Sequence, residues 1–125
     1  GGADFLINFR GSAIGIRADK SAPLNYEDHS PASLSDLDIL NKWVHVVWVM
    51  NPTESRIYLN ASLIAIISEA GTNEGFHDEF SFIGARQVWG SPDHFFTGKL
   101  DDIMIYNRAL SESEINLIYG LSDIR

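Results

Sequence analysis

Two adjacent carboxylates near the end of the chain, Asp101 and Asp102, are the side chains best suited to chemistry. They lie in an alternating apolar stretch, residues 99–107, in which successive residues of a strand would point to opposite faces. A glycosidase needs two carboxylates that face each other, about 5 Å apart in retaining enzymes and farther apart in inverting ones. Because a strand offers only one of these two carboxylates to either side, the pair does not predict a glycosidase.

Other catalytic patterns do not emerge from the sequence either. There is no Ser-His-Asp order, no phosphate-binding loop and no His spacing typical of a zinc motif, although His77 and His94 stand beside acidic residues. We expect His45 to be a buried structural residue, with its second ring nitrogen hydrogen-bonded to the backbone or to a Tyr. We predict that the chain is not an enzyme.

A cluster around Trp89 is the best candidate binding site. Sugars are recognised by aromatic platforms and planar polar side chains at loop tips. Polar partners stand next to Trp89, and weaker additions come from two other loops; in order, these residues are Arg86, Gln87, Asp93, His94, Tyr26 and Asn73. The alternative is that Trp89 folds back to cap an open edge of the core, and both interpretations stay open.

The composition bounds the class of protein. The chain has 125 residues, of which 45% are hydrophobic and 11% aromatic, enough for one core and one domain. Its net charge of −8 argues against nucleic acid and anionic membrane as partners, and it is compatible with neutral glycans or cations. No apolar run approaches the roughly 20 residues needed to span a bilayer. The absence of cysteine excludes disulfides.

Short alternating stretches predict the elements that must position these residues. Residues 43–50 are apolar on both faces, so we expect a central strand with both faces covered. Turn-rich segments, including residues 86–94, predict loops between the strands. The other expected strands are residues 5–10, 13–18, 55–59, 63–68, 80–83 and 99–107. This pattern is typical of an antiparallel β-sandwich.

A short helix is expected over residues 111–119. Ser111 and Glu114 have the spacing of a capping box, and the apolar residues on either side of this start, Leu110 and Ile115, have the spacing of a hydrophobic staple. Gly120 is predicted to end the helix in the left-handed conformation. A helix this short needs docking to persist, so its apolar side chains must pack onto the domain: Ile115, Ile118 and Tyr119.

Four stretches of the chain resemble one family. They read WVHVVWVM, RIYLN, FSFIGA and FFTGKLDDIMIYNRALSESEINLIY, and the last is the most specific. Together they are similar to the laminin-G-like jelly rolls of the concanavalin A-like lectin and glucanase superfamily. The resemblance implies a two-sheet jelly-roll sandwich with one short carboxyl-terminal helix, used as a non-catalytic extracellular module that binds glycans or proteins. The Glu-x-Asp-x-x-Glu motif of the superfamily's glucanases is absent.

The resemblance also implies a structural calcium ion. In relatives an acidic residue of the last motif helps to hold calcium together with loop oxygens near the domain's start, which would make Asp101, ahead of Asp102, a ligand here. The alternative is that the carboxylate braces the neighbouring backbone or pairs with Arg108. Both interpretations stay open.

The chain departs from the family pattern in two places. Strands that usually precede the region of residues 5–18 are absent, so we expect residues 1–125 to be one domain that lacks its first strands, is trimmed, or takes them from another chain. Ala61 stands where the family commonly has Gly, and because a type I′ turn would place its Cβ at positive φ, we expect another turn type. Residues 60–62 also fit the N-glycosylation pattern.

These observations predict a carbohydrate-binding or adhesion module of an extracellular or cell-surface protein, with a glycan or protein as its ligand. The alternative, from a different class, is a structural or assembly domain that packs against a protein partner or the rest of its parent chain.

Overall fold

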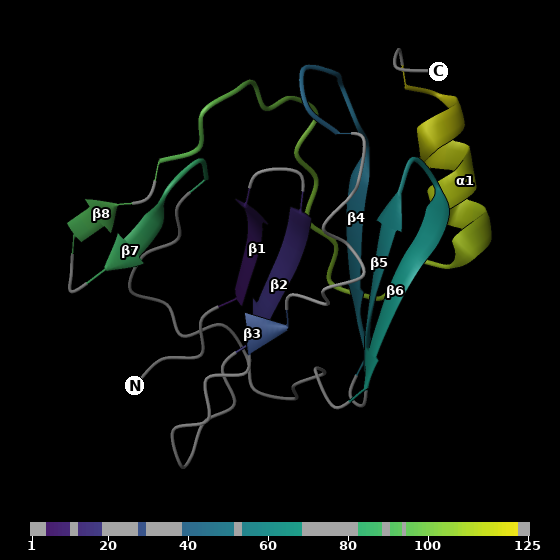
Figure 1. Cartoon of the computed structure of the whole chain (residues 1–125). Coiled ribbons are helices and arrows are strands. Elements are labelled where there is room, and N and C mark those ends of the chain that lie inside the picture. The colour runs from purple at the N-terminus through teal and green to yellow at the C-terminus, as the bar shows by residue number, and fades with distance from the viewer. Residues whose placement is uncertain are drawn as a thin grey trace.

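The computed structural model describes residues 5–10, 13–18, 28–29, 39–51, 54–68, 83–88, 91–93 and 95–122. These residues are mostly strand with one short helix, and every strand pairing is antiparallel (Figure 1). In chain order the elements are β1 (Phe5–Arg10), β2 (Ala13–Ala18), β3 (Asp28–His29), β4 (Val46–Met50), β5 (Glu54–Leu59), β6 (Ser62–Ser68), β7 (Arg86–Val88), β8 (Ser91–Asp93) and α1 (Glu112–Gly120).

The strands form three separate antiparallel groups, with the orders β1-β2-β3, β4-β5-β6 and β7-β8. Figure 1 shows β1 and β2 between the β7-β8 pair and the β4-β5-β6 sheet, with α1 at the far side of that sheet. The extensive contacts of each strand run to neighbours in its own sheet. The antiparallel β class and the terminal helix are therefore confirmed, whereas these contacts do not establish a closed two-sheet sandwich.

Among the described strands, the strongest predicted one, β4, lies at an edge of its sheet rather than at the centre. Among the described strands it pairs with β5 alone, through Cα partners that include Val46 with Leu59 and Trp48 with Ile57. The prediction of a central strand was wrong because side chains apolar on both faces need cover above and below, which does not require two strand neighbours. One face packs into a cluster around the buried Ile39 and Ile57, with Val44, Val46, Trp48, Leu59, Ile64 and Ala65.

Helix α1 contributes cover for the opposite face of β4. Val49 and Tyr58 are buried on that face together with Ile115 from the helix, whose side chain is fully buried. Val47, Ala61 and Leu110 pack around them. Full burial of an Ile side chain is worth about 1.5–3 kcal/mol. The helix therefore packs onto the sheet through Ile115, as its sequence predicts.

Hydrogen bonds cap α1 at both of its ends. The capping box is confirmed, because the Glu114 N–H donates to Ser111 Oγ (3.2 Å) and the Ser111 N–H donates to Glu114 Oε1 (3.0 Å). The prediction for Gly120 was wrong: the helix includes it, and the cap is Leu121 with φ −87°. Leu121 and Ser122 donate their N–H groups to carbonyls of the last turn, so no left-handed residue is needed there.

The turn between β5 and β6 also differs from its prediction. Asn60 and Ala61 have φ values of 49° and 64°, the positive pair that is typical of a type I′ turn. Asn60 is fixed there because its Oδ1 accepts from the His45 N–H (2.9 Å) and its own N–H donates to the His45 carbonyl (2.8 Å). The cost of about 1 kcal/mol for Ala61 is largely offset because it packs against the cluster around Ile115.

Candidate functional site

The predicted strand over residues 99–107 does not form. Residues 101–106 are in no strand, and Asp102 has a φ of 51° that interrupts any extended run. The Asp102 N–H donates to Asp101 Oδ1 (2.8 Å), so a carboxylate of the pair braces the backbone beside it. Asp and Asn tolerate positive φ better than other residues through such local bonds. The prediction was wrong because alternation alone does not supply a neighbouring strand.

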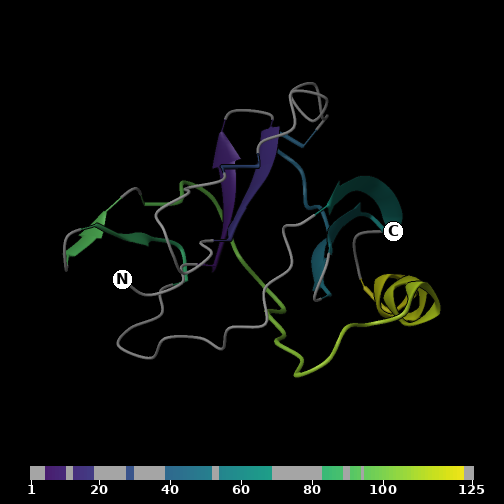
Figure 2. The ribbon, with the colours of Figure 1, turned by 90° about the horizontal axis from the view of Figure 1, so that it is seen from below.

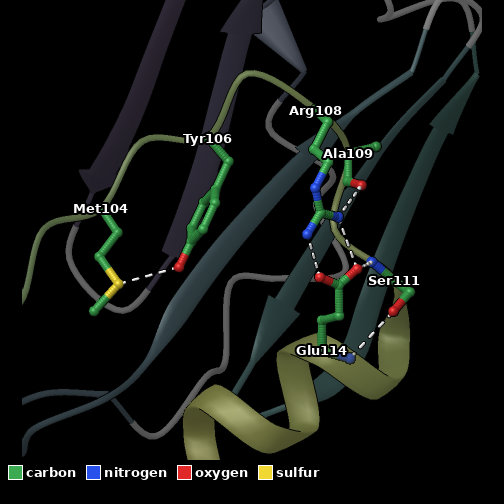
Figure 3. A network of polar contacts seen from close by, with 6 residues as sticks. All are labelled: Met104, Tyr106, Arg108, Ala109, Ser111 and Glu114. Carbon is green, nitrogen blue, oxygen red and sulfur yellow. Dashed lines mark hydrogen bonds and ion pairs between the residues drawn. The ribbon is translucent and has the colours of Figure 1, made fainter.

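Arg108 does not pair with either aspartate. Its guanidinium forms two bonds to the Glu114 carboxylate, from Nη1 to Oε1 (2.8 Å) and from Nη2 to Oε2 (2.5 Å), as Figure 3 shows. The hydrogen bond from Arg108, followed by that from the Ser111 backbone, lowers the pKa of Glu114 to about 2. The same pairing raises the pKa of Arg108. One carboxylate thus joins the helix cap to the chain that precedes it.

The described residues do not complete a calcium site. Calcium takes six to eight oxygen ligands, and no group of three or more His, Cys, Asp or Glu side chains that could hold a metal occurs in the part of the chain that the structure describes. Asp101 and Asp102 are both exposed, and one Asp101 oxygen already accepts from the backbone. A calcium ion here would need oxygen ligands from outside the described ranges.

Residues 100–106, named here the apolar segment, are exposed despite their composition. The exposed fraction is 52% for Ile103, 82% for Ile105 and 44% for Tyr106. Leu100 and Met104 are exposed as well, and the Tyr106 hydroxyl donates to Met104 Sδ (3.2 Å, Figure 3). Figure 2 shows the apolar segment as chain outside any helix or strand, on the path from β8 to α1. No backbone hydrogen bond joins residues 103–106 to another described residue.

The residues predicted to bind sugar are only partly placed. Residues 86–94 were expected to be a loop, but β7 and β8 pair as a hairpin in which Arg86 lies opposite Asp93 and Gln87 opposite Pro92. This correction follows from a close return of the chain, since only residues 89 and 90 separate the two strands. The hairpin brings together the backbones of Arg86, Gln87 and Asp93. The other candidates lie outside the described residues: Trp89, His94, Tyr26 and Asn73.

His45 has a role that the sequence did not reveal. Its ring lies beside that of Tyr119 on α1, with centroids 5.8 Å apart and planes tilted by 30°. The ring nitrogen Nδ1 is buried and has no hydrogen-bond partner among the described residues, contrary to our expectation. Burial lowers the pKa of His45, which favours the neutral ring. The only available signal was an aromatic residue, Tyr119, on the docking face of the helix.

A search of solved structures gives a match to a crystal structure at 2.1 Å resolution of an S-layer domain-containing protein from Clostridium thermocellum, residues 221–444. The TM-score is 0.58 and the sequence identity 19%, over 86% of this chain and 51% of that one. The chain therefore spans about half the length of the structure it matches. A search of the curated proteins finds no match.

No helix among the described residues is long and apolar enough to cross a membrane. A family model, Laminin_G_3, described as the concanavalin A-like lectin/glucanases superfamily, matches residues 2–116. That match covers nearly the whole chain, including three of the four stretches that resemble laminin-G-like domains and all but the last three residues of the fourth. The chain belongs to the concanavalin A-like lectin/glucanases superfamily, in its laminin-G-like branch.

Proposed function

We propose that this chain is a non-catalytic module of an extracellular or cell-surface protein, and that it docks onto protein through the apolar segment. The exposure of Ile103, Ile105 and Tyr106 is the observation that carries the proposal. Family membership supports a binding or structural role without catalysis. The S-layer domain-containing neighbour supports a cell-surface setting.

The chemistry of the apolar segment favours an extended polypeptide as its partner. Residues 103–106 are four consecutive apolar residues, and their backbone groups are not paired with other described residues. Such a chain binds by strand addition, in which backbone hydrogen bonds give affinity and side-chain pockets give specificity. The charges at its ends balance, with Lys99 and Arg108 against Asp101 and Asp102, so the overall charge of −8 is not concentrated here. The partner strand comes from another protein or from the rest of the parent chain.

Site-specific photo-crosslinking in the intact protein on its native cells tests this proposal. A benzophenone amino acid replaces Ile105 in one variant and Leu117 in the other, which is a matched control because Leu117 is 65% exposed on the outer face of α1. We expect a discrete crosslinked peptide from position 105 and none from position 117. Equal crosslinking from both positions, or none from either, would count against docking at this segment.

A glycan is the second candidate ligand, favoured by the hairpin β7-β8. Its register brings the backbones of Arg86 and Asp93 together, and the connecting residues 89–90 include Trp89. Charged and amide side chains beside an aromatic ring are what a sugar-binding surface needs.

A glycan array with three proteins tests the second candidate. We expect the wild type to bind a defined set of glycans and Trp89→Ala to lose them. Trp43→Ala, which removes a half-exposed Trp from the segment before β4, is expected to retain them. If neither the wild type nor the control variant binds any glycan, the carbohydrate proposal is removed while docking to protein stands.

Calcium binding at Asp101 stays a proposal of the family resemblance. Thermal melting with added calcium and with chelator would detect it, because an ion bound only by the folded chain raises the melting temperature. We expect Asp101→Asn to abolish any such shift. A shift of the same size in that variant would remove Asp101 as a ligand.

A further inference from the structure

The two ends of α1 are held by different chemistry. At its start, Arg108 bonds twice to Glu114, and Ser111 and Glu114 cap each other. At its end the described contact is between two rings, Tyr119 and His45. The first end is held by charge and hydrogen bonds, and the second depends on a titratable ring that stays neutral.

His45 is poorly placed to accept a proton. Its Nδ1 is shielded from water and has no hydrogen-bond partner among the described residues. Its backbone is fixed on both sides by Asn60, which accepts from the His45 N–H and donates to the His45 carbonyl, so the residue is tied to the β5–β6 turn. A protonated ring would therefore carry an Nδ1–H donor that is shielded from water and has no acceptor among the described residues, which disfavours the charged form.

The described groups around His45 do not supply a compensating negative charge. On α1 the titratable group that faces His45 is Tyr119. Glu112 and Glu114 lie in the first turn, and the helical rise places Glu112 about 10 Å from Tyr119 along the axis. The β5–β6 turn carries only Asn60 and Ala61, and on β5 Glu54 pairs with Arg56. Lys42 precedes His45 on its own segment.

Two features oppose this effect without cancelling it. The carboxyl end of a helix and the face of a Tyr ring both attract a cation, and α1 has no basic residue in its last turn. Against them stands the burial of Nδ1, which has no hydrogen-bond partner among the described residues, and burial lowers the pKa of His45.

We propose that His45 makes the docking of α1 sensitive to acid. Below about pH 6.5, the carboxyl-terminal end of α1 detaches from the sheet, while its amino-terminal end stays docked. The detached end would uncover the ring of His45, which Tyr119 lies against in the docked helix, whereas Ile115 would keep Val49 and Tyr58 covered.

The sign follows from linkage. Above the ordinary His pKa near 6.5, His45 is neutral whether α1 is docked or free, and docking is at full strength. As the pH falls below that value, the freed ring takes up a proton that the docked ring resists, so docking weakens until the docked ring also protonates. Glu114, with a pKa of about 2, keeps its charge throughout this range and continues to bind Arg108.

Amide hydrogen exchange at pH 7.5 and pH 5.0, corrected for intrinsic rates, tests the proposal on the wild type. The Leu121 N–H, bonded to Leu117, reports the end of α1, and the Ile115 N–H, bonded to Ser111, reports its start. We expect Leu121 to lose protection at pH 5.0, by at most about tenfold per pH unit because one proton is involved, and Ile115 to keep it. Equal loss at both amides, or no loss at Leu121, would overturn the proposal.

Two variants assign the effect to one ring. His45→Gln is expected to abolish the loss at Leu121, and a variant with His29, His77 and His94 all replaced by Gln is expected to retain it. If His45→Gln does not fold, an NMR titration of the His45 ring in the wild type decides. A measured pKa at or above the ordinary His value would overturn the proposal, and a lower one would support it.

Discussion

Helix α1 and the apolar segment lie next to each other in the sequence, and both carry large apolar side chains, but only one of them buries those side chains. Ile115 of the helix is fully buried against Val49 and Tyr58. Ile105, ten residues earlier, is 82% exposed. The helix satisfies its own backbone and needs only a surface to pack on, whereas a strand needs a neighbour for its backbone as well.

This difference shows what each part of the molecule lacks. The sheet β4-β5-β6 has clusters on both of its faces, one of them built with α1. The apolar segment has neither a paired strand nor a covered face within the described residues. A partner strand would supply both, and the following variants measure how separate the two regions are.

The largest effect is expected from Ile115→Ala. It removes the buried anchor of α1 and leaves a cavity, so the free energy of unfolding should fall by about 2–5 kcal/mol in a urea titration. Leu117→Ala on the exposed side of the same helix is the matched control, and its effect should stay within about 0.5 kcal/mol. Similar losses in both variants would contradict the assigned docking face.

Ser111→Ala should have a smaller effect on the same helix. It removes the hydroxyl that accepts from the Glu114 N–H, and loss of such a cap costs about 1 kcal/mol. Ser111→Gly should lower the free energy of unfolding by only about a few tenths of a kcal/mol. Urea unfolding followed by far-UV circular dichroism compares the two variants, and an equal cost would show that the hydroxyl is not what holds this end.

The double variant Ile103→Ser with Ile105→Ser tests the exposed side of the comparison. Both side chains are largely in solvent, so the free energy of unfolding should change by no more than about 0.5 kcal/mol for each substitution. Binding of a dye that reports exposed apolar surface should nevertheless fall. A loss of stability as large as that of Ile115→Ala would mean that the segment is buried in solution.

Ala61→Gly should have the smallest effect. Glycine relieves the positive φ at this position, worth about 1 kcal/mol, but it also removes a methyl group that packs beside Ile115, worth about 0.8 kcal/mol. The two terms nearly cancel, so unfolding midpoints should be nearly equal. A clear gain in stability would show that the packing of Ala61 contributes little.

Local signals in the sequence predicted the start of α1 correctly, because Ser111, Glu114 and Leu110 interact within a few residues of one another. The end of the helix was mispredicted because the amides of Leu121 and Ser122 take over the role assigned to Gly120. The turn at Ala61 was mispredicted because packing from a distant helix, which no local pattern records, offsets its backbone cost.

Strand predictions succeeded where a partner lies close in sequence. The pair β5 and β6 has such a partner, whereas the strand over residues 99–107 has none among the described residues. For the candidate site, the register of β7 and β8 places Arg86, Gln87 and Asp93, and the role of Trp89 stays a prediction. The place of His45 beside Tyr119 depends on a contact between residues 74 positions apart, which one sequence cannot reveal.

The pair of hydrogen bonds between Arg108 and Glu114 has a mechanical consequence. Tension on the apolar segment would reach α1 along the main chain, and the two hydrogen bonds from Arg108 to Glu114 would give a second connection into the first turn of the helix. Ile115 in that turn packs into the sheet against Val49 and Tyr58. A pull on the docked segment would therefore be borne by the core of the module before it could peel the helix away.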